Sequence, residues 1–200
     1  MGKSIFGFPF NHSGNMKLFI LVLSLTLWTR EAISADNIAV YFSPAGGCTE
    51  AVVSNLNQAK SNVLVQAYSF TSAPIAKALV DAKKRGVNVQ VILDKSQRTE
   101  KYSSADFLLH EGVPTFIDAK HAIAHNKIMI LDGATVLTGS FNFTKAAESN
   151  NAENLLVIHD AELAAKYTVN WQAHLQHSDT YSGKLPGIPD THSARTRGVK

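Results

Sequence analysis

Four side chains that can bind a phosphate group or move a proton gather around one predicted hairpin. His125 and Lys127 are two positions apart at the start of an apolar segment, so they point to the same face of a strand. The returning strand brings Ser140 beside them, and Asn142 lies two positions further on. An ammonium, a hydroxyl and a carboxamide can donate hydrogen bonds to an oxyanion, most naturally a phosphate. The imidazole adds a nucleophile or proton carrier that works near neutral pH.

The segment that positions these residues has the pattern of an antiparallel hairpin. Residues 127–131 and 135–138 are predicted strands, and the Asp132-Gly133 pair between them is typical of tight turns. Gly139 lets a ligand or a second backbone approach closely. From the residues alone, the polar cluster is either a phosphate site or a strand-end group with no special role.

The other periodic segments alternate between strand and helix. We expect further strands at residues 38–42, 63–70, 87–93, 113–117 and 154–159. We expect helices after a cap at Thr49, from Ser72 to Gly86, near residues 105–111, and after a cap at Asp160. Two strand–helix–strand units close together favour an α/β fold, a three-layer α-β-α sandwich with a mixed, largely parallel central sheet.

The predicted domain, residues 36–177, lies between two segments of different character. Residues 18–28 form an apolar and hydroxyl run that is too short to span a bilayer but suits the core of a secretory signal. We therefore expect a signal peptide over residues 1–35, with 1–15 as an upstream extension of the reading frame; the alternative is an uncleaved anchor. Residues 178–200 show no hydrophobic period and are expected to form a flexible tail.

Composition excludes several classes of protein. The 200 residues are 45% hydrophobic and 18% charged, which excludes collagen-like, disulfide-scaffold and wholly disordered chains. The single cysteine, Cys48, excludes an intramolecular disulfide and a multi-cysteine zinc site. A net charge of +3, which becomes +1 without residues 1–35, does not by itself indicate nucleic-acid binding. The signal predicts a periplasmic or secreted protein.

The spacing of the hairpin residues resembles that of a known family. The pattern H-x-K-x4-D-x6-G-S is similar at every position to the HKD motif of the phospholipase D superfamily, and a G-S-x-N extension follows it. These positions hold His125, Lys127, Asp132, Gly139, Ser140 and Asn142. The segments YFSPAGG (41–47) and QAYSFTS (66–72) resemble the small bacterial EDTA-resistant endonuclease branch. The resemblance extends over roughly residues 37–176.

The resemblance implies a mechanism with two histidines. Larger family members carry two HKD motifs and this chain has one, so a homodimer with one active site at its two-fold axis is implied. One His125 would attack phosphorus to form a phosphohistidine, and the other would protonate the leaving oxygen. The phosphoryl oxygens would be held by Lys127, Ser140 and Asn142. Glu153 would hydrogen-bond the far nitrogen of His125, and Asp132 would be structural. No metal or cofactor is implied.

Three functions follow from these considerations. The leading one is metal-independent, non-specific cleavage of DNA, and of RNA, by a phosphodiesterase. The alternative is a phospholipid phosphodiesterase of the same fold. The third is a dimeric phosphate-binding module without chemistry, which the intact His125, Lys127 and Glu153 set disfavours. No stable membrane association is expected after signal cleavage, because residues 36–177 contain no amphipathic basic helix.

Several other residues remain open. His121 and His125 form an H-x3-H pair, but no glutamate follows His121 and His125 opens an apolar strand, so we expect no metal site there. Lys120 and His121 either contact a nucleic-acid backbone or are an exposed pair with no role. Residues at the ends of the second and third predicted strands either line a substrate groove or pack; they are Tyr68, Ser69, Thr71 and Asp94.

Overall fold

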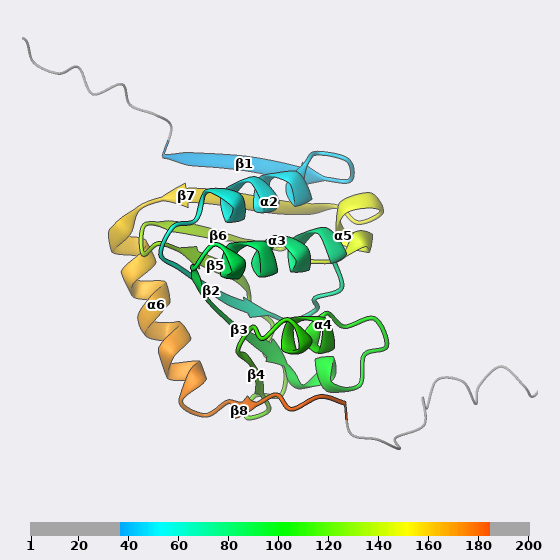
Figure 1. Cartoon of the computed structure of the whole chain (residues 1–200). Coiled ribbons are helices and arrows are strands. Elements are labelled where there is room, and N and C mark those ends of the chain that lie inside the picture. The colour runs from blue at the N-terminus through cyan, green and yellow to red at the C-terminus, as the bar shows by residue number, and fades with distance from the viewer. Residues whose placement is uncertain (1–36, 185–200) are drawn as a thin grey trace, which may run out of the picture. The chain divides into compact units, whose positions relative to one another are not determined.

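The computed structural model describes residues 37–184 (Figure 1). The predicted signal peptide (residues 1–35), the neighbouring Asp36 and residues 185–200 of the predicted tail lie outside the described residues. No helix in the described part is both long and apolar enough to cross a bilayer.

Eight strands form one mixed sheet in the order β1-β7-β6-β5-β2-β3-β4-β8. The strands are β1 (Ile38–Ser43), β2 (Asn62–Ala67), β3 (Asn88–Asp94), β4 (Thr115–Asp118), β5 (Lys127–Leu131), β6 (Thr135–Gly139), β7 (Glu153–His159) and β8 (Asp179–Thr180). Parallel pairing occurs between β2 and β3 and between β3 and β4, and the other neighbours in this sheet are antiparallel.

Helices cover both faces of the sheet. They are α2 (Cys48–Gln58), α3 (Ala73–Lys84), the 3-10 helix η1 (Lys95–Arg98), α4 (Ala105–His110), α5 (Lys145–Ser149) and α6 (Ala161–Leu175). One core joins the buried sides of α2, α3 and α4 to one face of the sheet. On the other face, Trp171 of α6 packs with Leu64 and Ile130 and donates a hydrogen bond to the Val65 carbonyl at 2.9 Å. The three-layer sandwich with a mixed sheet is therefore confirmed.

The sheet is less parallel than the sequence pattern suggested. The pattern predicted a largely parallel sheet, but β1 forms the far edge and pairs antiparallel with β7, with Val40 opposite Leu156. Alternation of strand and helix sets the class of the fold, but it does not choose a strand's partner. Because β1 pairs with β7 and not with β2, parallel pairing among the eight strands is confined to β2, β3 and β4.

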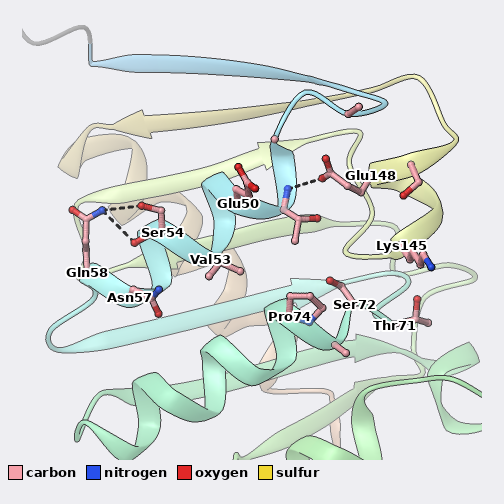
Figure 2. Close-up of a pocket in the computed structure, with 15 residues that line it drawn as sticks. Glu50, Val53, Ser54, Asn57, Gln58, Thr71, Ser72, Pro74, Lys145 and Glu148 are labelled. Carbon is pink, nitrogen blue, oxygen red and sulfur yellow. Dashed lines mark hydrogen bonds between the residues drawn. The ribbon is translucent and has the colours of Figure 1, made fainter.

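The start of α2 also differs from the expectation. Thr49 lies inside the helix, and Gly47, in the left-handed conformation with φ of 80°, precedes it. The Glu148 carboxylate of α5 accepts a hydrogen bond from the Thr49 backbone N–H at 2.7 Å (Figure 2). A negative group is stabilising at a helix N-terminus. Glu148, which is distant in the sequence, therefore caps the helix in place of the expected Thr49. Cys48 is fully buried in the first turn of α2.

Residues 178–184 belong to the fold, so the boundary predicted at residue 177 is too early. β8 pairs antiparallel with β4, with Asp179 opposite Ile117. Tyr181 is buried, and its hydroxyl donates a hydrogen bond to Asp106 at 2.7 Å. The segment has too few apolar residues for a periodic pattern, and two backbone pairings and one buried ring hold it instead.

Asp132 ties the β5–β6 hairpin to the start of β2. Its carboxylate accepts hydrogen bonds from the backbone N–H groups of Lys60 at 3.0 Å, Ser61 at 2.8 Å and Asn62 at 3.1 Å, and from the Ser61 hydroxyl at 2.8 Å. Burial raises the pKa of the Asp132 carboxyl, but these hydrogen bonds outweigh it and hold the pKa below its ordinary value. The contacts are structural and involve no group of the catalytic motif besides Asp132.

We expect Asp132→Asn to lower the free energy of unfolding by about 1–3 kcal/mol, because an amide cannot replace the two-oxygen acceptor. Since the folded pKa is depressed, this stabilisation is present above an unfolded pKa of about 3.9 and is lost as pH falls through the folded value. Urea unfolding of both proteins at pH 7 and below pH 4 checks this. The control is Asp81→Asn, whose partly exposed carboxylate contacts only Lys77 on the same helix. Equal stability of Asp132→Asn and wild type at pH 7 would contradict the prediction.

A bulge follows β6 at Gly139. The backbone N–H groups of Ser140 and Phe141 both donate to the Asn154 carbonyl, each at 3.1 Å, so two residues face one in β7. Gly139 has φ of 148°, and a Cβ added there would lie 2.3 Å from the same carbonyl oxygen. Only glycine fits, and the bulge turns Ser140 out of the regular strand pattern.

Gly139→Ala is expected to lose about 2–4 kcal/mol of stability through strain and the backbone clash. Gly86→Ala is the matched control, because Gly86 also has positive φ, 93°, but has open space around its Cβ position. Chemical denaturation of the two variants separates the clash from the conformational cost alone. Equal losses in both would mean that the close approach to Asn154 has no energetic effect.

Candidate active site

The motif residues meet at the edge of the sheet that is formed by strand ends. There β2, β3 and β4 end and β5 and β7 begin. Ala67, the last residue of β2, pairs with Lys127, the first of β5. Gly139 ends β6 opposite Leu155, two residues after Glu153 starts β7. Residues separated by up to 28 positions are thus gathered at one edge by antiparallel pairing.

His125 lies just before β5, at the end of a connection (residues 119–126) that starts after β4. The buried Asp94 carboxylate accepts a hydrogen bond from the Ala124 N–H at 2.7 Å, and the Tyr68 N–H donates to the Asn126 carbonyl at 2.8 Å. The His125 ring is exposed and lies against Tyr68, with 4.7 Å between ring centroids. The backbone is therefore held on both sides of an accessible imidazole.

Lys127 is the buried cation of the site. Its side chain is almost covered, and its Nζ donates to the His125 carbonyl at 2.7 Å and lies 5.2 Å from the centroid of the Tyr68 ring. Burial lowers the pKa of the Lys127 ammonium, and the negative charge of Glu153 opposes this shift only in part. An ammonium with little water around it binds an incoming anion strongly, because the charge is poorly solvated.

Ser140 and Asn142 have hydrogen-bonding capacity to spare. The Ser140 hydroxyl oxygen accepts from the backbone N–H of Asn154 at 3.1 Å and from its amide nitrogen at 3.4 Å, which leaves the hydroxyl proton free to donate. The Oδ1 atom of Asn142 is buried with no hydrogen-bond partner among the described residues. This oxygen is an acceptor, so an unprotonated phosphate oxygen cannot satisfy it, and it is the amide NH2 group of Asn142 that can donate to a phosphate.

Glu153 lies at the start of β7, opposite Ser43 of β1. Its carboxylate accepts a hydrogen bond from the Asn151 amide at 3.1 Å. Within the described residues, no hydrogen bond joins Glu153 to His125, so the contact implied by the resemblance stays a prediction. Glu153 is near enough to Lys127 to influence its pKa.

A groove lies beside this edge, between α2, α3 and the start of α5 (Figure 2). Thr71, Ser72 and Lys145 line one end of it, and Asn57 and Gln58 line the other. None of the motif residues lines this groove. Of the residues left open above, Thr71 therefore faces the groove, whereas Tyr68 contacts His125.

His121 and His125 are not brought together as a metal pair. His121 instead lies with Asp118, His174 and His177. Beside His125, the donors are an ammonium, a hydroxyl and a carboxamide, a set that suits an oxyanion better than a cation.

Two supporting residues could not be assigned from the sequence. Asp94 ends a strand and could have been a ligand or a cap; its carboxylate in fact caps η1 through the Ser96 N–H at 2.9 Å and holds Ala124. Asn154 supports both Gly139 and Ser140, yet it has no distinguishing sequence signal. Both residues make hydrogen bonds with backbone groups of other segments, and such bonds produce no recognisable pattern of residue types in the sequence.

Comparisons with known proteins agree with this geometry. Residues 52–175 match the family described as "Cardiolipin synthase, PLD-like domain". A phospholipase D from Rickettsia conorii is 38% identical over 154 residues, 77% of each chain. A mitochondrial cardiolipin hydrolase from Xenopus laevis is 30% identical over 170 residues, 74% of this chain and 81% of that one.

A solved structure extends the likeness to three dimensions. Nuc from Salmonella typhimurium, a phospholipase D family member, is 41% identical to this chain. It superposes with a TM-score of 0.69 over 72% of this chain and 97% of that one. The chain therefore belongs to the phospholipase D superfamily, as an enzyme of the phosphodiesterase type.

Proposed function

We propose that this protein cleaves DNA, and RNA, without sequence preference and without a metal ion in the reaction. The observation that carries the proposal is the contact of the exposed His125 with the buried Lys127, at the same strand ends where Ser140 keeps a free donor. Because His125 is exposed, a long polymer can approach it, and these groups can bind its phosphates. The likeness to Nuc supports the same conclusion.

Charge around the edge also favours a polyanion. Three exposed lysines lie on segments that follow strands ending there: Lys95 after β3, Lys120 after β4 and Lys145 after β6. Contacts of lysine with phosphates supply affinity without reading bases. This arrangement suits a nuclease that binds the backbone and tolerates any sequence.

The reaction that we propose has two steps at one phosphorus. A neutral His125 nitrogen attacks phosphorus, a P–N bond forms, and the bond to the leaving oxygen breaks while a second, protonated His125 gives that oxygen its proton. The second imidazole then takes a proton from water, whose oxygen attacks phosphorus and releases His125. Lys127, Ser140 and Asn142 stabilise the charge on the phosphoryl oxygens.

Because one chain carries one such histidine, the proposal requires a homodimer with the active site on its two-fold axis. Glu153 would support the cationic ring in each step, as a carboxylate does in other histidine-dependent sites. The signal peptide proposed for residues 1–35 would deliver the dimer to the periplasm or the exterior.

Phospholipid cleavage is the second candidate. The relatives from Rickettsia conorii and Xenopus laevis are named phospholipase D and cardiolipin hydrolase, and their phosphodiester chemistry would be the same. Ile123, two residues before His125, is 57% exposed and offers an apolar contact beside the site. Phe42, 64% exposed and next to the Ser43 that pairs with Glu153, offers a second apolar contact. We favour the nucleic acid because the three lysines provide charge for its phosphates, whereas these two apolar side chains lie on separate segments.

Purified protein should nick plasmid DNA in excess EDTA and leave phosphatidylcholine–cardiolipin vesicles intact. His125→Asn should lower the nicking rate by about a thousandfold or more, since the nucleophile is gone, while DNA binding survives through Lys127. His110→Asn, an exposed histidine of α4, is the matched control. Rates come from gel assays and binding from filter retention.

The outcomes separate the two candidates. Release of phospholipid headgroups with intact DNA would replace the nuclease by the lipid enzyme. Nicking that disappears on chelation and returns only with added magnesium would contradict the metal-free reaction.

The shared site predicts that a heterodimer of one wild-type and one His125→Ala chain is nearly inactive. Such a dimer lacks either the nucleophile or its proton donor. Independent sites would instead leave about half the activity, by the number of intact sites. The measurement is DNA cleavage by a heterodimer purified through two different tags, under conditions of slow subunit exchange.

A heterodimer of wild-type and His110→Ala chains, prepared in the same way, controls for the tags. Half activity of the His125→Ala heterodimer, or full activity of a monomer at working concentration, would rule out the shared site.

A further inference from the structure

Four potential metal ligands converge at the end of β4, outside the motif. Asp118 is the last residue of β4, His121 follows it in the connection 119–126, and His174 and His177 lie at the end of α6 and just beyond it. One potential ligand atom from each side chain lies within 4.8 Å of the others. The residues are separated by up to 59 positions, so the cluster exists only because α6 returns to the β4 edge.

Three imidazoles point at one carboxylate oxygen. The Asp118 Oδ2 atom lies 2.8 Å from Nδ1 of His174, 2.9 Å from Nδ1 of His121 and 3.4 Å from Nε2 of His177. An oxygen has two lone pairs in the carboxylate plane, so it cannot accept well-directed hydrogen bonds from three rings at once. A cation among the four groups would let each ligand use its own lone pair.

The surroundings favour a built site over a chance surface group. Asp118 is fully buried, and the side chains of His174 and His177 are 17% and 23% exposed. The other oxygen of Asp118, Oδ1, accepts a hydrogen bond from the Lys120 N–H at 3.1 Å, which fixes the orientation of the carboxylate. Burial raises the pKa of Asp118, but the histidine hydrogen bonds outweigh it and keep the group ionised.

We propose that Asp118, His121, His174 and His177 bind one Zn²⁺ ion in a structural site separate from the active site. Three nitrogens and one oxygen form a donor set typical of tetrahedral zinc. In such a site the ligand atoms lie about 3.3 Å apart, so the side chains need only a small inward shift. Four protein ligands leave no open position for a substrate, which indicates a structural ion.

The site revises the expectation that the chain binds no metal. That expectation considered His121 with His125, whereas the fold turns His121 toward α6. The ion would fasten α6 to the end of β4 and to the first half of the connection that carries His125. Its role is to hold this connection, and no bond of the substrate is broken at it.

The test is zinc binding by purified protein without a polyhistidine tag. After removal of metal with a chelator and dialysis, the wild type should take up one Zn²⁺ per chain, measured by mass spectrometry of the metal. A hundredfold excess of Zn²⁺ over its Kd should raise the Tm by about 5 °C or more. Mg²⁺ and Ca²⁺ should have no such effect, because they prefer oxygen ligands.

The variant His174→Ala/His177→Ala should lose both the bound zinc and the Tm shift. The control His110→Ala/His159→Ala removes two histidines outside the cluster and should keep both. Zinc retained at one per chain by the first variant, or lost equally by the second, would overturn the proposal.

A spectroscopic measurement on the wild type does not depend on how the variants fold. Co²⁺ in a four-coordinate nitrogen and oxygen site gives intense visible absorption, and Zn²⁺ should displace it. A weak, six-coordinate spectrum or no binding would also overturn the site. Because DNA nicking is not the readout, failure of the zinc site and failure of the nuclease proposal are distinguishable.

Discussion

The hydrogen bond from Ala124 to the buried Asp94 carboxylate sets the position on which the chemistry depends. His125 lies outside the regular sheet, on a connection that must pass the ends of β3 and β2 to reach β5. Without these hydrogen bonds, a connection of this length would not hold the imidazole in one position. The Asp94 carboxylate on one side and the Tyr68 N–H on the other fix the backbone, so only the ring remains free.

The rest of the site follows from strand pairing around that point. Lys127 is placed by its pairing with Ala67, and Ser140 by the bulge at Gly139. Each side chain thus takes its position from a backbone ladder that is stable without any ligand. A catalytic site built this way loses little free energy to rearrangement when a charged phosphate arrives.

The sequence predicted the parts of the fold that local chemistry determines. The Asp132-Gly133 turn defines the hairpin, Asp160 caps α6 through the Leu163 N–H at 3.0 Å, and Pro74 marks the start of α3. Motif spacing then identified the residues of the candidate site before any coordinates, because strand pairing converts fixed spacing into proximity.

The missing parts depend on contacts between distant residues. The edge position of β1 depends on β7, the cap of α2 on Glu148, and the order of residues 178–184 on β4 and Asp106. The three histidines around Asp118 depend on such contacts too, because no local sequence pattern brings His174 and His177 to the end of β4. Such contacts become visible only when the whole sheet is assembled.

The short pairing of β8 with β4 has a practical meaning for anyone who handles this protein. An uncovered strand edge offers backbone donors and acceptors to any passing strand and promotes aggregation. Two residues of β8 and the buried ring of Tyr181 cover the β4 edge. Truncating the chain before residue 178, for example to attach a C-terminal affinity tag there, would remove that cover and is expected to lower solubility.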